Sequence, residues 1–481
     1  MIISDSQIKD AIYSIVGNKI SSILSEIERF DISGRYDSKS IENCIYSDIA
    51  CFARPHIYNA LRIGNQRDSS SGSRKVKYLD SFIEKLVCVR LTMLMNFIGR
   101  CMPIMSEKIF IAPGNGKIEC EFLAGDSHSG GRRPCLFRLN GNSYVLKFAD
   151  PRTQHILNAA ISVVEENLNF GLHFPEIVGQ SSDQCWQVLP MLNGHQISNL
   201  TDFSSQIGAI TAVAYFLEMT DIHLENLIIS DGKPVIVDSE CIFYNHDRVT
   251  KSVRDRLYST GLVSEDISIS AIRGGGDLSI FDIGNALEGG RLRYLNRAKS
   301  HKNRAIDDNG NLIDLSGSSK DVVKAFSSSL EVLVDNSDAI SDLVSSKAYH
   351  DIRTRFLVRP TAHYKCAMEM LFSPIRGDRS SVMKKVLSRL VNLPSFADGM
   401  AVDADRCEIS DMLNGDVPYF YCQGDLPFVF HEGNPISKAD NCFTFKHRFF
   451  KALELMNPCR VHEAGKEFHL YLTSRSVGVK S

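Results

Sequence analysis

Carboxylate, carboxamide and imidazole side chains are concentrated in the stretch TDIHLENLIISDGKPVIVDSE, which runs from Thr220 to Glu240. Asp221 and Asn226 stand five positions apart, and Asp238 and Glu240 follow a short apolar run. Phosphoryl transfer needs a base beside the acceptor hydroxyl and a metal ion that bridges the phosphate oxygens. Asp221 suits the base, while the other three residues supply the hard oxygen ligands that Mg²⁺ prefers. The stretch therefore predicts a magnesium-dependent phosphoryl-transfer site.

A loop followed by a β-hairpin is expected to hold these groups. Leu227–Ile229 is apolar, Asp231-Gly232 is a strong two-residue turn signal, and Pro234–Val237 is the returning strand. The Asp-x4-Asn spacing before the hairpin is that of the protein-kinase catalytic loop. His223 is close enough in the chain to add a ligand or to support one. The plain alternative is an Asp-rich hairpin with a capped loop and no catalytic role.

Three strands and a glycine-containing loop precede this stretch. The strands are expected over Ile118–Phe122, Pro134–Leu139 and Tyr144–Phe148, with the loop Gly125–Gly131 after the first. Backbone N–H groups of such a loop can approach phosphates. Lys147, on the third strand, can reach phosphates as a point charge. The order matches the small lobe of a kinase, although a glycine loop with one lysine is weak evidence by itself.

A helix over Pro151–Asn169 follows, and Glu165 or Glu166 near its end is a candidate partner for the lysine; two solvated surface acids are the alternative. Trp186–Pro190 is predicted as a strand at a hinge between lobes. Ser205–Glu218 is predicted as an apolar helix that leads into the catalytic loop.

Three arginines lie close together in RTRFLVRPT, at positions 353, 355 and 359, and Thr361 ends this stretch. Arginine binds phosphate through paired hydrogen bonds, so the cluster predicts a phosphate clamp. Ordinary surface arginines on a strand edge are the alternative.

Composition sets broad limits. The chain has 481 residues and a net charge of −3, which gives no general attraction to nucleic acid or to a membrane surface. Its 13 cysteines include no Cys-x-x-Cys pair, a pattern that favours reduced thiols in a cytoplasmic protein. The N-terminus lacks signal-peptide character, and no apolar run is long enough for a membrane span.

The predicted fold class is α+β, with a bilobal catalytic core like that of lipid kinases and protein kinases, elaborated by N- and C-terminal helical regions. The expected division is an N-terminal helical region (1–115), a small lobe (116–195), a large lobe with the catalytic loop (196–298), a mobile loop with helices (299–345), and an elimination element with a C-terminal helical region (346–481).

Taken together, the motifs resemble the dehydratase domain of class II lanthipeptide synthetases, the LanM type. The matching segments, in chain order over roughly 115–425, are Gly125–Gly131, Lys147, Asp221–Asn226, Asp238–Glu240, Arg355–Thr361 and Asp416–Phe420.

The resemblance implies a lipid-kinase-like fold and two reactions in one site. The enzyme would phosphorylate Ser or Thr of a precursor peptide with ATP and Mg²⁺, and would then eliminate phosphate to leave dehydroalanine or dehydrobutyrine. The residues implied for phosphorylation are Lys147, Asp221, His223, Asn226, Asp238 and Glu240. Those implied for elimination are Arg355 and Thr361, with Asp126 and His128 near the leaving phosphate, and Gly130, Gly131 and Glu165 are expected to contact the nucleotide.

The sequence also departs from the family pattern. It ends soon after Asp416–Phe420, so no cyclase domain is expected in this chain, and a separate cyclase or tailoring enzyme is the expected partner. The usual Lys-Pro-Arg is replaced by a longer segment from Lys147 to Arg152. Two alternatives remain at this stage: a kinase that leaves a phosphorylated peptide or small molecule, and a peptide-binding protein without catalysis.

Overall fold

We describe the fold from a computed structural model of the chain. The described residues are 21, 25, 37, 39–40, 42–43, 118–123, 127–129, 131–139, 141–192, 194, 196–197, 199–223, 225–243, 252–263, 270–272, 305–359, 361, 364, 367–368, 401–438 and 444–474. The predicted N-terminal helical region thus falls almost wholly outside them.

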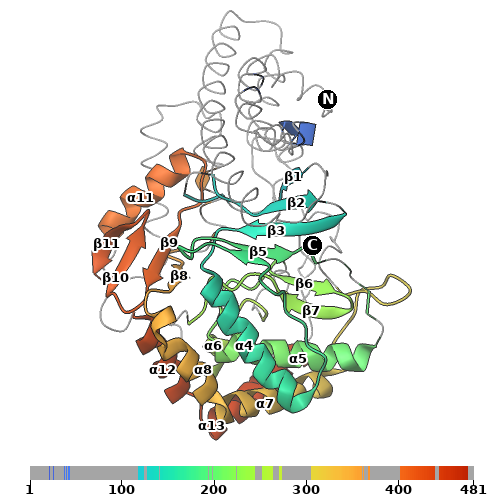
Figure 1. Cartoon of the computed structure of the whole chain (residues 1–481). Helices are drawn as coiled ribbons and strands as arrows, with labels where there is room; N and C mark the ends of the chain where they lie inside the picture. Colours follow the sequence, from blue (N-terminus) through green and yellow to red (C-terminus); the bar gives the residue numbers. More distant parts are fainter. Residues whose placement is uncertain are drawn as a thin grey trace, which may run out of the picture.

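A five-stranded antiparallel sheet lies above the coloured helices α4, α5 and α7 in Figure 1, in the order β1-β2-β3-β5-β4. Its strands are β1 (Glu119–Phe122), β2 (Cys135–Leu139), β3 (Asn142–Lys147), β4 (Gly179–Gln180) and β5 (Gln187–Pro190). The three strands and the hinge strand expected from the sequence are all present. In the register of β3 with β5, Lys147 lies opposite Gln187.

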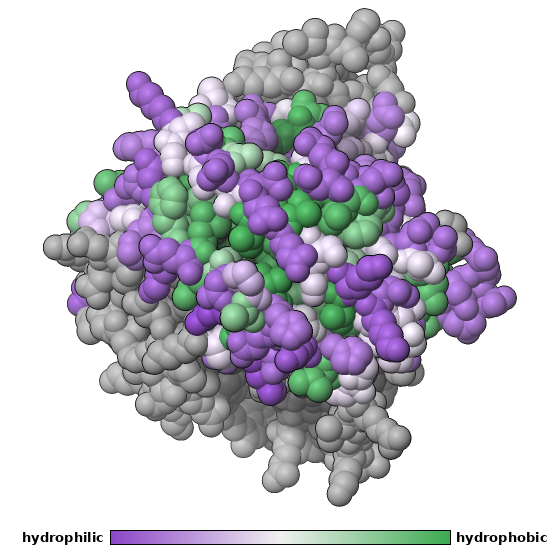
Figure 2. All heavy atoms as spheres, turned by 90° about the horizontal axis from the view of Figure 1, so that it is seen from below, coloured by the Kyte–Doolittle hydropathy of each residue, from purple (hydrophilic) through white to green (hydrophobic). Residues whose placement is uncertain are grey.

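Helices form the lower layer around one large apolar core (Figure 1). They are α4 (Pro151–Leu168), α5 (Leu200–Phe216), α6 (Val253–Ser259), α7 (Ser319–Asp335), α8 (Ser337–Ser345), α12 (Phe445–Glu454) and α13 (Pro458–Thr473), with a short 3-10 turn, η3 (Lys347–Tyr349). Seen from below, hydrophilic residues cover much of the described surface, with apolar residues between them (Figure 2).

The central helix α5 is buried along most of its length. Asn199 caps its start by accepting hydrogen bonds from the N–H groups of Thr201 and Asp202. Helix α7 packs directly against it at Gly208, where a Cβ atom would lie only 2.2 Å from the carbonyl oxygen of Val322. Helix α7, which belongs to the predicted unit 299–345, therefore shares the apolar core of α5.

A second antiparallel sheet, of four strands, lies beside the first (Figure 1), in the order β11-β10-β9-β8. Its strands are β8 (Arg353–Phe356), β9 (Phe420–Gln423), β10 (Phe428–His431) and β11 (Asn434–Lys438), and helix α11 (Ala401–Leu413) accompanies them. The C-terminal region was predicted to be helical, and this sheet corrects that prediction.

The hairpin after α5 consists of β6 (Leu227–Ser230) and β7 (Lys233–Ile236). Both turn residues have positive φ, 49° for Asp231 and 76° for Gly232, as a type I′ turn requires. The Asp-Gly pair thus sets the hairpin locally, as the sequence predicted.

The described part of the chain mixes helix and sheet. Among these residues, no helix has the length and apolar character needed to cross a membrane. The kinase-like arrangement of two lobes remains a prediction.

Candidate functional site

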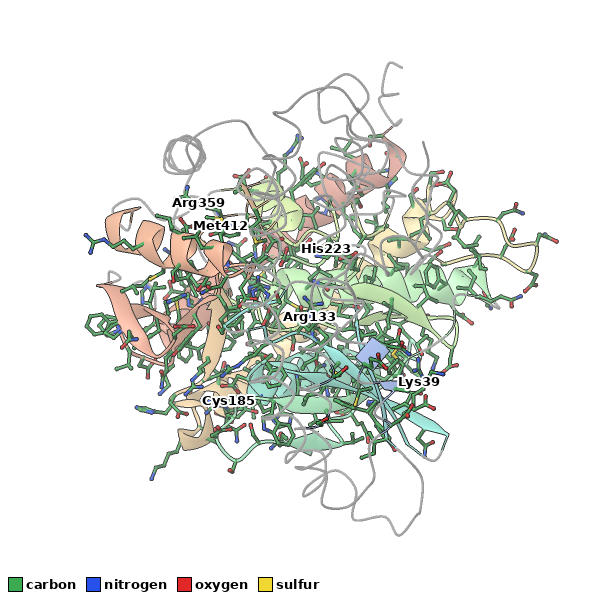
Figure 3. The ribbon with its side chains drawn as sticks, turned by 90° about the horizontal axis from the view of Figure 1, so that it is seen from above. Lys39, Arg133, Cys185, His223, Arg359 and Met412 are labelled. Atoms are coloured by element: carbon green, nitrogen blue, oxygen red, sulfur yellow. The ribbon has the colours of Figure 1, made fainter. Side chains whose placement is uncertain are left out.

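A cavity of about 330 Å³ lies between the five-stranded sheet and the β6–β7 hairpin. It contains most of the side chains singled out from the sequence, although they come from segments far apart in the chain. Figure 3 shows His223 and Arg133 of this cavity near the middle of the molecule. The predicted residues that line it are His128, Lys147, Asp221, His223, Asn226, Asp238, Glu240, Arg355 and Thr361.

Backbone hydrogen bonds fix the loop that carries Asp221. The N–H of Thr220 donates to the carbonyl of Cys241 (3.0 Å), and that of Ile222 donates to the carbonyl of Thr260 (2.9 Å). Asp221, between them, has a φ of 64°. Asp and Asn tolerate this left-handed conformation better than most residues. Hydrogen bonds on both sides of Asp221 therefore fix the loop in a conformation that aspartate tolerates.

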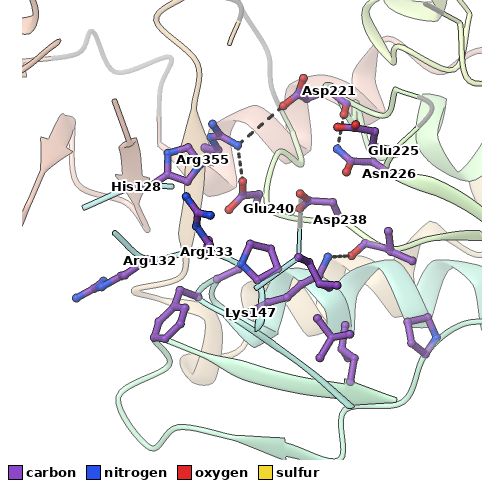
Figure 4. A pocket seen from close by; sticks show the side chains of 18 of the residues that line it. His128, Arg132, Arg133, Lys147, Asp221, Glu225, Asn226, Asp238, Glu240 and Arg355 are labelled. Carbon is purple, nitrogen blue, oxygen red and sulfur yellow. Dashed lines mark hydrogen bonds and ion pairs between the residues drawn. The ribbon is translucent and has the colours of Figure 1, made fainter. Parts of the chain in front are cut away.

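Lys147 faces the hairpin across the cavity, and its Nζ donates to the carbonyl oxygen of Val237 (Figure 4). Apolar side chains from the end of β5 and beyond line the same space, including Leu189 and Met191. Trp186, at the start of the predicted hinge strand, is buried elsewhere and is absent from this lining.

Asn226 and Asp238 provide a fitting pair of ligands for Mg²⁺. The Nδ2 group of Asn226 donates to the carbonyl of Asp221 (2.8 Å), so Oδ1 is the atom that would bind a cation. Among the described residues no group of three or more His, Cys, Asp or Glu side chains could hold a metal ion. Mg²⁺ commonly needs only one or two protein oxygens, because waters and substrate phosphates complete its shell.

Glu240, predicted as a metal ligand, has both carboxylate oxygens engaged by protein groups. Oε1 accepts from Nη1 of Arg355 (2.6 Å), and Oε2 accepts from the hydroxyl of Tyr419 (3.2 Å). Burial and the nearby Asp238 carboxylate raise the pKa of Glu240 to about 7, although Arg355 opposes the shift. Glu240 therefore holds Arg355 in this structure, and its role as a metal ligand stays a prediction.

Arg355 links the predicted phosphorylation residues to the predicted elimination residues. Its Nη1 lies 2.6 Å from Glu240 and 3.9 Å from Oδ2 of Asp221 (Figure 4). Burial alone would lower the pKa of Arg355, but the facing Glu240 carboxylate outweighs it and keeps the pKa well above its ordinary value. The guanidinium therefore remains charged, and its side chain is 6% exposed.

The glycine loop is held by the 416–420 segment, and this overturns one prediction. The N–H of Gly131 donates to Oδ2 of Asp416 (3.0 Å), and the hydroxyl of Ser127 donates to Oδ1 (2.7 Å). The Gly131 amide is thus not directed at a phosphate, because a buried carboxylate has taken it. Asp126 and Gly130 lie outside the described residues.

Glu165 also lies away from the site, which corrects its predicted pairing with Lys147. Its carboxylate accepts from the N–H groups of Gly171 (2.9 Å) and Leu172 (2.9 Å), beyond the end of α4. Those amides need an acceptor where the helix stops, and Glu165 satisfies them. Glu166 is exposed.

Only one of the three clustered arginines enters the cavity. Arg353 contacts Sγ of Cys185 (3.0 Å), and Arg359 donates to Glu408 (3.0 Å). Figure 3 shows Arg359 beside Met412 of α11, apart from His223. These partners hold Arg353 and Arg359 outside the cavity, so the two residues do not help to form a phosphate clamp.

The lining also includes residues that were not assigned from the sequence, among them Arg132, Arg133 and Tyr419. The two arginines directly follow the glycine loop, and that adjacency was the available signal. Tyr419 belongs to the quoted segment Asp416–Phe420, but the sequence offered no reason to give it a role.

Comparison with known proteins agrees with the motifs. A family model described as a domain of unknown function, DUF4135, matches residues 99–423, more than half of the chain. The lacticin 481/lactococcin biosynthesis protein LcnDR2 of Lactococcus lactis subsp. lactis is 23% identical over 273 residues. The alignment covers 51% of this chain and 28% of that relative. The similarity to LcnDR2 supports the resemblance to LanM-type proteins, and the chain belongs to the DUF4135 family.

Proposed function

We propose that this protein is a peptide Ser/Thr dehydratase that phosphorylates a precursor peptide with ATP and Mg²⁺ and then eliminates the phosphate. The observation that carries the proposal is the shared cavity. Lys147, Asp221, Asn226 and Asp238 line it together with Arg355. A kinase-like catalytic core is part of the same proposal.

In the first reaction, Asp221 accepts the proton of the Ser or Thr hydroxyl. The hydroxyl oxygen forms a bond to the terminal phosphorus of ATP, and the bond from that phosphorus to the bridging oxygen of ADP breaks. Lys147 orients the phosphates as a fixed positive charge. Asn226 and Asp238 would hold Mg²⁺, and the ion would neutralise charge on the phosphate oxygens.

In the second reaction, a base removes the Cα proton of the phosphorylated residue. The electron pair forms the Cα=Cβ bond as the Cβ–O bond breaks, and phosphate leaves with Arg355 and Thr361 beside it. Hydroxide leaves poorly, whereas phosphate leaves with its charge compensated by arginine.

We assign His128 as the base that removes the Cα proton in this second reaction. Its Nδ1 lies 2.7 Å from the carbonyl oxygen of Val417, which can only accept a hydrogen bond. Nδ1 therefore carries the hydrogen, and Nε2 is the basic nitrogen of the neutral ring.

An intact-mass assay tests the proposal. The protein is co-expressed with the short Ser/Thr-containing peptide encoded beside its gene, and the peptide mass is compared with and without the enzyme. Loss of water supports the dehydratase. Gain of phosphate without loss of water supports a kinase that does not eliminate, and an unchanged mass in the presence of purified, ATP-saturated protein rejects both activities for that peptide.

A further inference from the structure

The segment Asp416–Phe420 has no catalytic assignment, yet it reaches both halves of the site. Asp416 binds the glycine loop, and Val417 binds it twice, through its N–H to Ser127 (2.8 Å) and through its carbonyl to His128. Tyr419 then extends into the cavity itself.

Tyr419 contacts three groups of the cavity. Its hydroxyl donates to Oε2 of Glu240 (3.2 Å). The guanidinium carbon of Arg355 lies 5.5 Å from the centre of its ring, within the range of a cation–π contact. The ring of His128 is 5.4 Å away and tilted by 59°.

Arg355 needs such support because only one of its donors is engaged. Among the described residues, its buried Nε and Nη2 atoms have no hydrogen-bond partner, while Nη1 binds Glu240. Buried donors without acceptors are costly, so a charged ligand is expected to satisfy them. A long side chain held at one nitrogen has several rotamers, and the flat face of Tyr419 limits them.

We propose that Tyr419 is a positioning residue for the elimination step: its ring and hydroxyl hold Arg355 and Glu240 so that the remaining guanidinium donors bind the leaving phosphate. This inference rests on the proposed dehydratase function and adds a residue to it. Tyr419 contacts Glu240, Arg355 and His128 directly. None of these is among the residues proposed above to act in phosphoryl transfer, which are Lys147, Asp221, Asn226 and Asp238, so the loss of Tyr419 is expected to separate the two reactions.

The test compares Tyr419→Leu and Tyr419→Phe with the wild type in the same co-expression assay, supplemented by the phosphoserine form of the peptide, which bypasses the first reaction. Tyr419→Leu removes ring and hydroxyl and is expected to slow elimination about tenfold, while phosphorylation changes less than about twofold. Tyr419→Phe keeps the ring and is expected to slow elimination about threefold. Phosphopeptide accumulates in both cases.

Tyr421→Leu is the matched control. Tyr421 lies two residues further along the chain. The guanidinium carbon of Arg353, and not that of Arg355, lies 5.7 Å from the centre of its ring. Its loss removes a comparable contact outside the cavity, so the ratio of elimination to phosphorylation is expected to stay at the wild-type value.

The outcomes are distinct. Equal loss of both reactions in the Tyr419 variants, or an unchanged ratio, overturns the positioning role while leaving the dehydratase intact. If Tyr419→Leu does not fold, Tyr419→Phe decides, since it keeps the packing. A wild-type protein that neither adds nor removes phosphate overturns the proposed function, and this inference with it.

Discussion

The Asp221–Glu240 segment and strand β8 line the same cavity but are built in different ways. The first is a continuous loop and hairpin, in which the predicted catalytic loop, a type I′ turn and the terminal carboxylates follow one another within 20 residues. Strand β8 is held by partners distant in sequence: Arg353 and Arg355 donate their N–H groups to Asp150 (2.9 Å) and to the carbonyl of Glu240 (2.8 Å).

This difference separates the two proposed reactions. Groups for phosphoryl transfer are positioned by local backbone geometry, so a change there is expected to stop the whole sequence of reactions. Groups for elimination depend on the second sheet and on the 416–420 segment. Changes in that region are expected to leave phosphorylated peptide behind.

Asp221→Asn is expected to have the largest effect. The variant keeps the left-handed backbone conformation, which Asn accepts, but loses the proton acceptor. Both phosphorylation and dehydration should fall about 1000-fold, as for loss of a general base. Initial rates by mass spectrometry, with an unchanged melting temperature, check this. Normal dehydration by this variant would remove the proposed site.

Gly424→Ala tests the long-range construction. Gly424 follows β9 with a φ of 50°, and a Cβ there would lie 1.9 Å from the carbonyl oxygen of His350. The atoms that the Cβ would meet belong to the backbone and cannot move aside like a flexible side chain, so we expect a loss of about 3 kcal/mol in the free energy of unfolding.

Gly232→Ala is the local counterpart, because its cost comes from a φ of 76° in the hairpin turn. We expect this substitution to lower the free energy of unfolding by about 1 kcal/mol. Denaturant titration of both variants compares the two regions, and equal costs would contradict the distinction drawn between them.

Arg355→Lys keeps the positive charge but loses the paired donors. Elimination should slow about 100-fold while phosphorylation persists, because lysine cannot replace a planar guanidinium in binding phosphate. Arg353→Lys, on the same strand but outside the cavity, is the matched control and should dehydrate the peptide normally. Loss of phosphorylation in Arg355→Lys would show that the two reactions are not separated as proposed.

Glu240 predicts a pH dependence of stability. Its pKa rises from 4.5 to about 7 on folding, so the folded state binds more protons in that interval and the free energy of unfolding falls as pH rises through it. The full shift in pKa corresponds to a change of about 3 kcal/mol in the free energy of unfolding. Because the side chain is 12% exposed, solvent screening reduces the change that we expect to about 2 kcal/mol.

Denaturant titration gives the free energy of unfolding of the wild type and of Glu240→Gln at pH values from 4.5 to 7. The change with pH in the difference between the two proteins is the contribution of Glu240. A difference that stays constant with pH would mean that the pKa of Glu240 is not raised.

Sequence reasoning succeeded where neighbours in the chain decide the outcome. The β6–β7 hairpin, strands β1 to β3 and helices α4 and α5 follow from turn residues and apolar periodicity, which act over a few residues. The family motifs also identified Lys147, Asp221, Asn226 and Asp238, because each motif is a short run of residues that can be recognised in the sequence alone.

Tertiary structure decided the rest. The pairing of β9 with β8 could not be predicted, because it joins segments around Arg353 and Tyr421 that are far apart in sequence. Strands β10 and β11 extend this sheet from β9 and were not predicted either. Spacing could not show that Glu165 binds the backbone of Gly171, nor that Asp416 takes the Gly131 amide. The sequence by itself determined which chemical groups this protein carries and the local turns that present them. The tertiary structure decided which of those groups meet, because a buried polar atom takes whichever partner the packed fold brings within hydrogen-bond distance.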